Sequence, residues 1–171
     1  MTNSTTPEYQ TTADRFTDLK SSDLNPTEKK SLIALAVSVL AARHERGCAF
    51  ESPGTMRTYL QLKCADYRNE VFGCVFLDTR HRVVEHAELF QGTIDGATVH
   101  PRVVVQRALA VNAAAIVIFH NHPSGVAEPS QADRMMTRRL TDALALVDIR
   151  ILDHFVVGES ESVSFAERGW L

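Results

Sequence analysis

Two histidines, His120 and His122, stand one residue apart at the end of the apolar run AAIVIFH, residues 114–120. Side chains two positions apart on a β-strand lie on the same face, about 6.5–7 Å apart along it. Two imidazoles placed in this way can bind one ion, since zinc–nitrogen bonds are about 2.0–2.1 Å long. Asn121, between them, is expected to point to the other face. The pair therefore predicts a metal site where a buried strand leaves the core.

A third candidate ligand, Asp133, follows His122 by eleven residues. A turn through residues 123–125, Pro-Ser-Gly, can bring the chain back over the face that carries the histidines. Three protein ligands would leave a fourth tetrahedral position for water, which is the arrangement of catalytic zinc sites. Two plainer interpretations stay open. Buried histidines are often hydrogen-bonded and inert, and Ser130 with Asp133 also forms the S-x-x-D pattern of a helix capping box, which is compatible with metal binding.

The rest of the chain must supply the elements that hold these residues. Segments 70–78 and 82–90 are rich in β-branched and aromatic residues around a short turn, and they predict a β-hairpin. Further helices are expected over 56–68, 100–114 and 129–147, and further strands over 114–120 and 148–158. The helix over 129–147 has an apolar stripe, which consists of Met135, Met136, Leu140, Leu144 and Val147. Alternating elements that begin with a hairpin predict an α/β (α+β) fold, with a mixed sheet flanked by helices.

The N-terminal part has a different composition. Residues 1–24 are polar and predict a flexible lead, whereas residues 25–49 predict a helix with Asn25 as its cap and Pro26 in its first turn. Its apolar residues recur at helical spacing: Leu32, Leu35, Val39 and Leu40. The segment SPGT, residues 52–55, is expected to separate this helix from the next one.

Composition limits the classes of function. The 171 residues are 44% hydrophobic, which suits one domain with a real core, and the net charge of −3 gives no general attraction to nucleic acid or to anionic membranes. No apolar stretch approaches the roughly 20 residues that cross a bilayer. The three cysteines, Cys48, Cys64 and Cys74, lack C-x-x-C spacing, and we expect them to be reduced thiols. Because the sequence also shows no signal peptide, we expect a cytoplasmic protein.

The joint pattern H-x-H-P-x6-S-x2-D resembles the JAMM motif of the Jab/MPN+ metalloproteases; here it comprises His120, His122, Pro123, Ser130 and Asp133. The phrases FLDTRHRVVEHAELFQGTIDGATVHPR, AAAIVIFHNHPSGVAEPSQAD and LDHFVVG resemble the bacterial RadC family. The resemblance covers residues 50–171. It implies a JAMM/MPN-type (cytidine deaminase-like) mixed sheet between helices. It also implies one zinc ion held by His120, His122 and Asp133, with a bound water molecule.

The same resemblance asks for a glutamate at the start of an upstream strand, and Glu70 in NEVFGCVFLD fits that place. It implies that Glu70 takes a proton from the water and delivers it to the leaving amine, and that Ser130 donates a hydrogen bond to the developing oxyanion. An isolated glutamate at this position would otherwise be a solvated charge at a strand end. Asp153 and His154 in LDHFVVG either orient a ligand or are structural.

These features favour a zinc-dependent hydrolase that cleaves a peptide or isopeptide bond in a peptide or protein substrate. One alternative is a RadC-type accessory protein in DNA repair or mobile-element maintenance, which acts through partners or DNA. The acidic pI, near 6.1, counts against direct DNA binding. Longer RadC members also carry an N-terminal helix-hairpin-helix segment, and its DNA contact is not carried over because the first fifty residues hold no G-x-G hairpin loop. Another alternative is an interaction module with a vestigial metal site. Neither oligomeric state nor substrate identity follows from the sequence.

Overall fold

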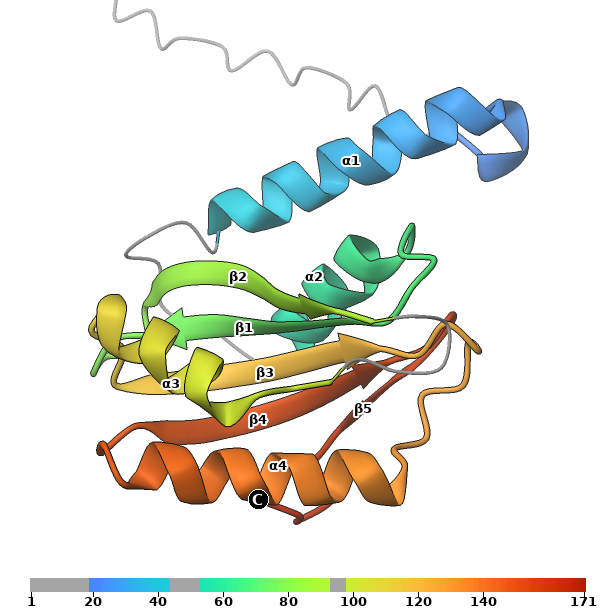
Figure 1. Cartoon of the computed structure of the whole chain (residues 1–171). Coiled ribbons are helices and arrows are strands. Elements are labelled where there is room, and N and C mark those ends of the chain that lie inside the picture. Colours follow the sequence, from blue (N-terminus) through green and yellow to red (C-terminus); the bar gives the residue numbers. More distant parts are fainter. Residues whose placement is uncertain (1–18, 44–52, 93–97) are drawn as a thin grey trace, which may run out of the picture.

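The structure is a computed structural model that describes residues 19–43, 53–92 and 98–171. Its centre is a sheet of five strands in the order β2-β1-β3-β4-β5, in which β3 and β4 are parallel and the other neighbours are antiparallel (Figure 1). The strands are β1 (Val71–Leu77), β2 (Val83–Gln91), β3 (Ala115–Asn121), β4 (Arg150–Val157) and β5 (Ser162–Ser164). The α-helices are α1 (Pro26–Arg43), α2 (Pro53–Cys64), α3 (Pro101–Ala110) and α4 (Gln131–Ala145), and a short 3-10 helix, Ser21–Asp23, precedes α1. The predicted mixed sheet flanked by helices is confirmed.

Most elements lie where the sequence predicts them, with shifts at their ends. The β1–β2 hairpin is confirmed, and α3 begins at Pro101 as expected. The predicted break at residues 52–55 is wrong for residues 53–55, because α2 begins at Pro53, where a first-turn proline loses no helical hydrogen bond; residue 52 lies outside the described part. Strand β5 has only three residues and was not predicted.

The N-terminal helix α1 begins as the sequence predicts. The side-chain oxygen of Asn25 accepts hydrogen bonds from the backbone N–H groups of Thr27 and Glu28, at 2.9 and 3.0 Å. The apolar stripe predicted from helical spacing is not in the core, since Leu35 and Val39 are 49% and 52% exposed, whereas Val37 packs against the cluster beneath α2. Residues 1–18 of the predicted lead, residues 44–49 and the side chain of Leu40 lie outside the described part. Every helix described is too short or too polar to cross a membrane.

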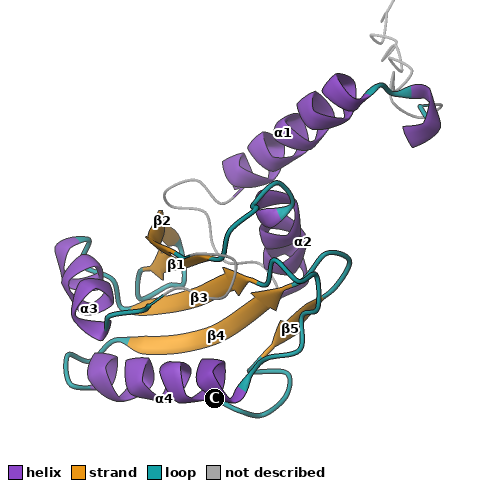
Figure 2. Ribbon diagram, turned by 45° about the vertical axis from the view of Figure 1, so that its right-hand side comes forward, coloured by secondary structure: helices purple, strands orange, loops and turns teal. Residues whose placement is uncertain are grey.

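Three helices cover the two faces of the sheet, with α2 on one face and α3 and α4 on the other (Figure 2). Strand β3 is buried along its whole length, as predicted for a strand covered on both faces. One hydrophobic cluster joins α2 to the sheet and includes Met56, Leu60, Val75, Val117 and Phe155. The other joins α3 and α4 to the sheet and includes Val104, Ile116, Ile118, Leu140 and Leu144.

The predicted apolar stripe of α4 is confirmed in part. Leu140 and Leu144 are fully buried, and Met136 packs against the same cluster. Met135 is 59% exposed, so its place in the stripe is wrong. A helix turns by about 100° per residue, which carries Met135 away from the face that Met136 shares with Leu140. Val147 packs against the cluster from just beyond the end of α4.

Two of the three cysteines, Cys64 and Cys74, are free thiols, as the sequence predicts, and both are buried; Cys48 lies outside the described residues. Burial raises the pKa of the Cys64 thiol to about 12 and holds the pKa of the Cys74 thiol well above its ordinary value. Both thiols are therefore protonated at neutral pH.

Candidate metal centre

His120 is the penultimate residue of β3, and His122 follows directly after the strand. The His120 side chain is 1% exposed and that of His122 is 18% exposed, so the pair lies at the edge of the core. Asn121 turns to the other side, where its Oδ1 accepts a hydrogen bond from the backbone N–H of Val71 at 2.8 Å. The predicted alternation is present, and the Asn121 amide fastens the start of β1 to the end of β3.

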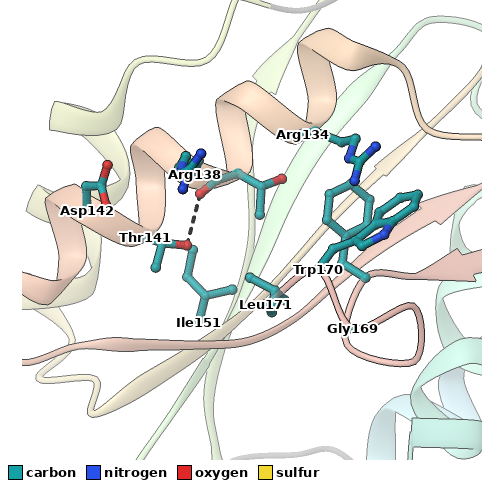
Figure 3. A pocket seen from close by; sticks show the side chains of 10 residues that line it. Arg134, Arg138, Thr141, Asp142, Ile151, Gly169, Trp170 and Leu171 are labelled. Carbon is teal, nitrogen blue, oxygen red and sulfur yellow. Dashed lines mark hydrogen bonds between the residues drawn. The ribbon is translucent and has the colours of Figure 1, made fainter.

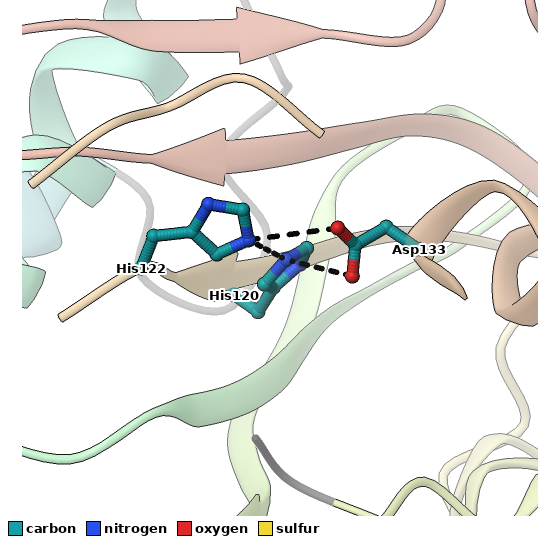
Figure 4. A group of neighbouring side chains, drawn as sticks. All are labelled: His120, His122 and Asp133. Atoms are coloured by element: carbon teal, nitrogen blue, oxygen red, sulfur yellow. Dashed lines mark hydrogen bonds and ion pairs between the residues drawn. The ribbon is translucent and has the colours of Figure 1, made fainter. Parts of the chain in front are cut away.

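The two imidazoles and the Asp133 carboxylate form one group of potential ligand atoms (Figure 4). The two Nε2 atoms are 3.0 Å apart; Nε2 of His120 lies 3.3 Å from Oδ1 of Asp133, and Nε2 of His122 lies 3.5 Å from its Oδ2. Ligand atoms about 2.0–2.1 Å from a tetrahedral zinc ion are separated by about 3.3 Å. The spacing of the three residues therefore fits zinc, and the donor set is one that zinc prefers.

The loop that carries His122 is fixed to the end of β4. The backbone N–H of His122 donates to the carbonyl of Val157, and its ring Nδ1 donates to the carbonyl of Val126, both at 2.8 Å. Gly125 has a φ of +84°, which favours glycine. At Gly158, a Cβ atom would lie 2.4 Å from the carbonyl oxygen of Gly125. Only glycine at residue 158 allows the loop to approach this closely.

Ser130 and Asp133 form the capping box that their spacing predicts. Oγ of Ser130 accepts a hydrogen bond from the backbone N–H of Asp133 at 3.1 Å, and Oδ2 of Asp133 accepts one from the backbone N–H of Ser130 at 2.7 Å. The Ser130 hydroxyl also donates to Oδ2 at 2.6 Å. The capping contacts leave Oδ1 directed at His120, so one carboxylate both caps α4 and faces the histidines.

Electrostatics in this group favour an ionised carboxylate. Burial alone would raise the pKa of Asp133, but the contacts with His120 and His122 outweigh burial and hold its pKa well below the usual range. The pKa of His122 is raised, mainly by the hydrogen bond with the Asp133 carboxylate. Burial lowers this pKa, whereas the Val126 carbonyl and the charge of Glu70 raise it further. In the absence of metal, the site therefore stabilises the protonated, positively charged form of His122.

Glu70, half-buried, immediately precedes β1. In the antiparallel pairing of β1 with β3, Phe72 lies opposite His120. Continuing this register by two residues places Glu70 opposite His122, on the face that carries the histidines. The fold therefore brings Glu70 to the edge of the cluster; its predicted proton-transfer role stays a prediction, as does the oxyanion role of Ser130.

The two adjacent residues left open by the sequence, Asp153 and His154, have different surroundings. His154 is fully buried, and its Nε2 lies 2.8 Å from Nδ1 of His120. The carboxylate of Asp153 accepts hydrogen bonds from the Ser164 hydroxyl at 2.6 Å and from the backbone N–H of Ala166 at 3.0 Å. His154 therefore contacts a candidate ligand, whereas Asp153 ties β4 to the C-terminal segment.

Thr137 is a further polar residue at this site that sequence reasoning missed. Its side chain is buried, and its Oγ1 lies 2.7 Å from Nδ1 of His154. One signal was present in the sequence. Thr137 follows Asp133 by one helical turn, so it lies on the same face of α4.

Two of the cavities in the described part of the chain differ in their relation to the site. One of about 320 Å³ is lined by His122, Pro123, Ser124, Glu159 and seven other residues, so it opens directly beside a candidate ligand. Another of about 490 Å³ runs along α4 towards Trp170 and is lined by none of the five predicted site residues (Figure 3). The cavity beside His122 is therefore the better candidate for a substrate site.

A buried strand that ends in two histidines and a helix that opens with a capping aspartate, together on one face of a mixed sheet, define a domain of the JAB class. The model of the RadC-like JAB domain family matches residues 50–170, and the chain belongs to this family. The resemblance to RadC proteins is confirmed.

Curated relatives agree with this assignment. A UPF0758 protein of Thioalkalivibrio sulfidiphilus is 62% identical over 141 residues, which cover 80% of this chain and 63% of that protein. A UPF0758 protein of Stutzerimonas stutzeri is 60% identical over 132 residues, 77% of this chain and 59% of the relative. A UPF0758 protein of Pseudomonas fluorescens is 51% identical over 164 residues, 93% of this chain and 72% of the relative. The chain spans about three fifths of the length of the first two relatives.

Proposed function

We propose that this chain is a zinc-dependent hydrolase of the JAMM type that cleaves a peptide or isopeptide bond. The observation that carries the proposal is the group of two imidazoles and one carboxylate, whose ligand atoms are 3.0–3.5 Å apart. Membership of the JAB class, which includes metalloproteases, supports the same chemistry. Buried free thiols on α2 and β1 suit a protein that works in the reducing cytoplasm.

In this proposal His120, His122 and Asp133 hold a single zinc ion. When bound, zinc would polarise the scissile carbonyl group and lower the pKa of a water molecule to about 7. The loop contacts of His122 and the capping contacts of Asp133 hold both side chains before any metal arrives, which reduces the ordering that binding requires.

Two further residues move protons and stabilise charge. A carboxylate oxygen of Glu70 takes the proton of the attacking water and then gives it to the leaving amine nitrogen. The Ser130 hydroxyl, which donates to Asp133 in the structure, donates to the carbonyl oxygen as negative charge develops there. One such donor typically contributes about 3 kcal/mol to transition-state stabilisation. The cavity beside His122 receives the polypeptide substrate.

The proposal is tested by comparing the wild-type chain with a Glu70→Gln variant, both loaded with zinc, on a mixture of peptides and isopeptide-linked conjugates. We expect both proteins to contain zinc, and only the wild type to release new amine termini that mass spectrometry detects. A fully active Glu70→Gln variant would remove Glu70 from the mechanism. Failure of the zinc-loaded wild type to cleave any amide bond would contradict the hydrolase assignment.

The inactive variant also serves as a trap for the substrate. Zinc-loaded Glu70→Gln protein is immobilised and exposed to a cell extract, with His122→Ala as the control that lacks a metal ligand. Polypeptides retained only by Glu70→Gln would identify the substrate class. Recovery of DNA in place of polypeptides would favour the accessory role in DNA repair.

A further inference from the structure

A continuous chain of hydrogen bonds connects helix α4 to the ring of His120. Oγ1 of Thr137 lies 2.7 Å from Nδ1 of His154, and Nε2 of His154 lies 2.8 Å from Nδ1 of His120. All three side chains are at most 2% exposed. The ring of Phe165 packs against His154 with the two ring centroids 4.4 Å apart, which limits rotation of the central imidazole.

The first bond in the chain has a definite direction. Thr137 Oγ1 also lies 2.7 Å from the backbone carbonyl oxygen of Asp133, and a carbonyl group can only accept. The single hydroxyl hydrogen of Thr137 is therefore donated to Asp133. Towards His154 the hydroxyl oxygen can only accept, so Nδ1 of His154 carries a hydrogen and donates it.

The remaining directions follow from the first. A fully buried imidazole between neutral partners is neutral and has one N–H group. Since that hydrogen is on Nδ1 of His154, Nε2 of His154 accepts from Nδ1 of His120. Neutral His120 then has a bare Nε2, which is the atom that faces His122 and Asp133.

We propose that Thr137 and His154 are positioning residues that select the Nδ1–H tautomer of His120 and so keep its Nε2 free to bind metal; the inference rests on the metal site proposed above. His122 is also held as the Nδ1–H tautomer, but by a backbone contact, because its Nδ1 donates to the carbonyl of Val126. The Thr137 hydroxyl also donates to the backbone of Asp133, so it connects two of the three ligand residues.

The chain offers a matched control for Thr137. The Thr141 hydroxyl, one turn later on α4, makes the same kind of bond to the carbonyl four residues back, at 3.0 Å (Figure 3). The hydrogen bonds of the His154 ring go to Thr137 and His120 and not to Thr141. Thr137→Val and Thr141→Val therefore remove equivalent helix contacts, and only the first also removes the acceptor for His154. Thr137→Ser restores the hydroxyl.

Zinc affinity, measured by competition with a chromophoric chelator, is the first readout. Loss of a partner that orients a metal-bound histidine typically weakens metal binding by about 10–100-fold. We expect a loss of this size for Thr137→Val, and affinities close to wild type for Thr141→Val and Thr137→Ser. Equal affinity of Thr137→Val and Thr141→Val would overturn the inference.

A second readout needs no metal. Long-range proton–nitrogen NMR correlations assign the tautomer of each histidine ring in the metal-free wild-type protein above neutral pH. We expect His120 as the Nδ1–H form in the wild type and a mixture of tautomers in Thr137→Val. A wild-type His120 that carries its hydrogen on Nε2 would contradict the inference even if zinc binds. Absence of zinc binding with the expected tautomer would instead contradict the proposed metal site.

Discussion

Helices α2 and α4 cover opposite faces of the same sheet, but they contribute to the core in different ways. The buried residues of α2 are all hydrophobic: Met56, Tyr59, Leu60 and Cys64. The buried hydrophobic residues of α4, Leu140 and Leu144, lie in its second half, whereas its first half carries Asp133 and the buried Thr137. The core on the α4 side therefore changes from apolar to polar along one helix.

The difference separates the source of stability from the site of chemistry. Burial of apolar side chains contributes about 25 cal/mol per Å² without any directional requirement. Buried polar groups give stability only when each one has a partner, and the buried Thr137 hydroxyl near the start of α4 has its partners, Asp133 and His154, at the candidate metal centre. We therefore expect substitutions on α2 to change folding alone, and substitutions near the start of α4 to change metal binding.

The largest effect on stability is expected from Leu60→Ala. Leu60 is fully buried in the hydrophobic cluster beneath α2, and leucine-to-alanine changes in such places lower the free energy of unfolding by about 2–5 kcal/mol. Urea denaturation of the metal-free protein measures this loss. The folded variant should bind as much zinc as the wild type; reduced zinc content would show that the two faces are not independent.

Gly158→Ala is expected to affect both stability and metal binding. The added methyl group would collide with the backbone of Gly125 and displace the loop that holds His122. Overpacking of this kind lowers the free energy of unfolding by about 1–3 kcal/mol. Chelator competition should show weaker zinc binding. Gly169→Ala is the control, because a Cβ atom added at Gly169 would meet no atom of a non-adjacent residue within 4 Å, and the zinc affinity of this variant should be unchanged.

A smaller effect is expected from Ser130→Ala, which removes the cap of α4. Loss of a serine cap typically costs about 1 kcal/mol, and denaturation of the metal-free protein measures it. A loss of unfolding free energy as large as that of Leu60→Ala would mean that the start of α4 contributes more to stability than its contacts indicate.

The smallest effect is expected at the two described cysteines, one on each face of the sheet. In a Cys48→Ser variant at pH 8, a thiol reagent should modify neither Cys64 nor Cys74 until denaturant is added. Burial keeps both thiols protonated, and the pKa of Cys64 is raised to about 12, so reactivity should increase only as the pH approaches that value. Rapid labelling of the folded protein would contradict the packing of both faces.

Much of this arrangement can be predicted from the sequence because its signals are local. The continuous apolar run predicts β3, alternation along the strand predicts that His120 and His122 share a face, and S-x-x-D predicts that Asp133 lies in the first turn of α4. A recognisable spacing supports each step.

The remaining features depend on contacts between distant segments. The contact between Thr137 and His154 joins residues 17 apart, and the contact of His154 with His120 joins residues 34 apart. Strand β5 is only three residues long and exists through its pairing with β4. Periodicity also cannot decide which apolar stripe is covered, since Leu35 on α1 is exposed although its spacing matches that of a buried helix.

The central claim is that two imidazoles and one carboxylate bind a single metal ion at this end of the sheet. Its most direct test is metal analysis of the purified wild-type protein beside His122→Ala, with circular dichroism to verify that both are folded. We predict one zinc ion per wild-type chain and none in the folded variant. Equal zinc content in the two proteins would contradict the account.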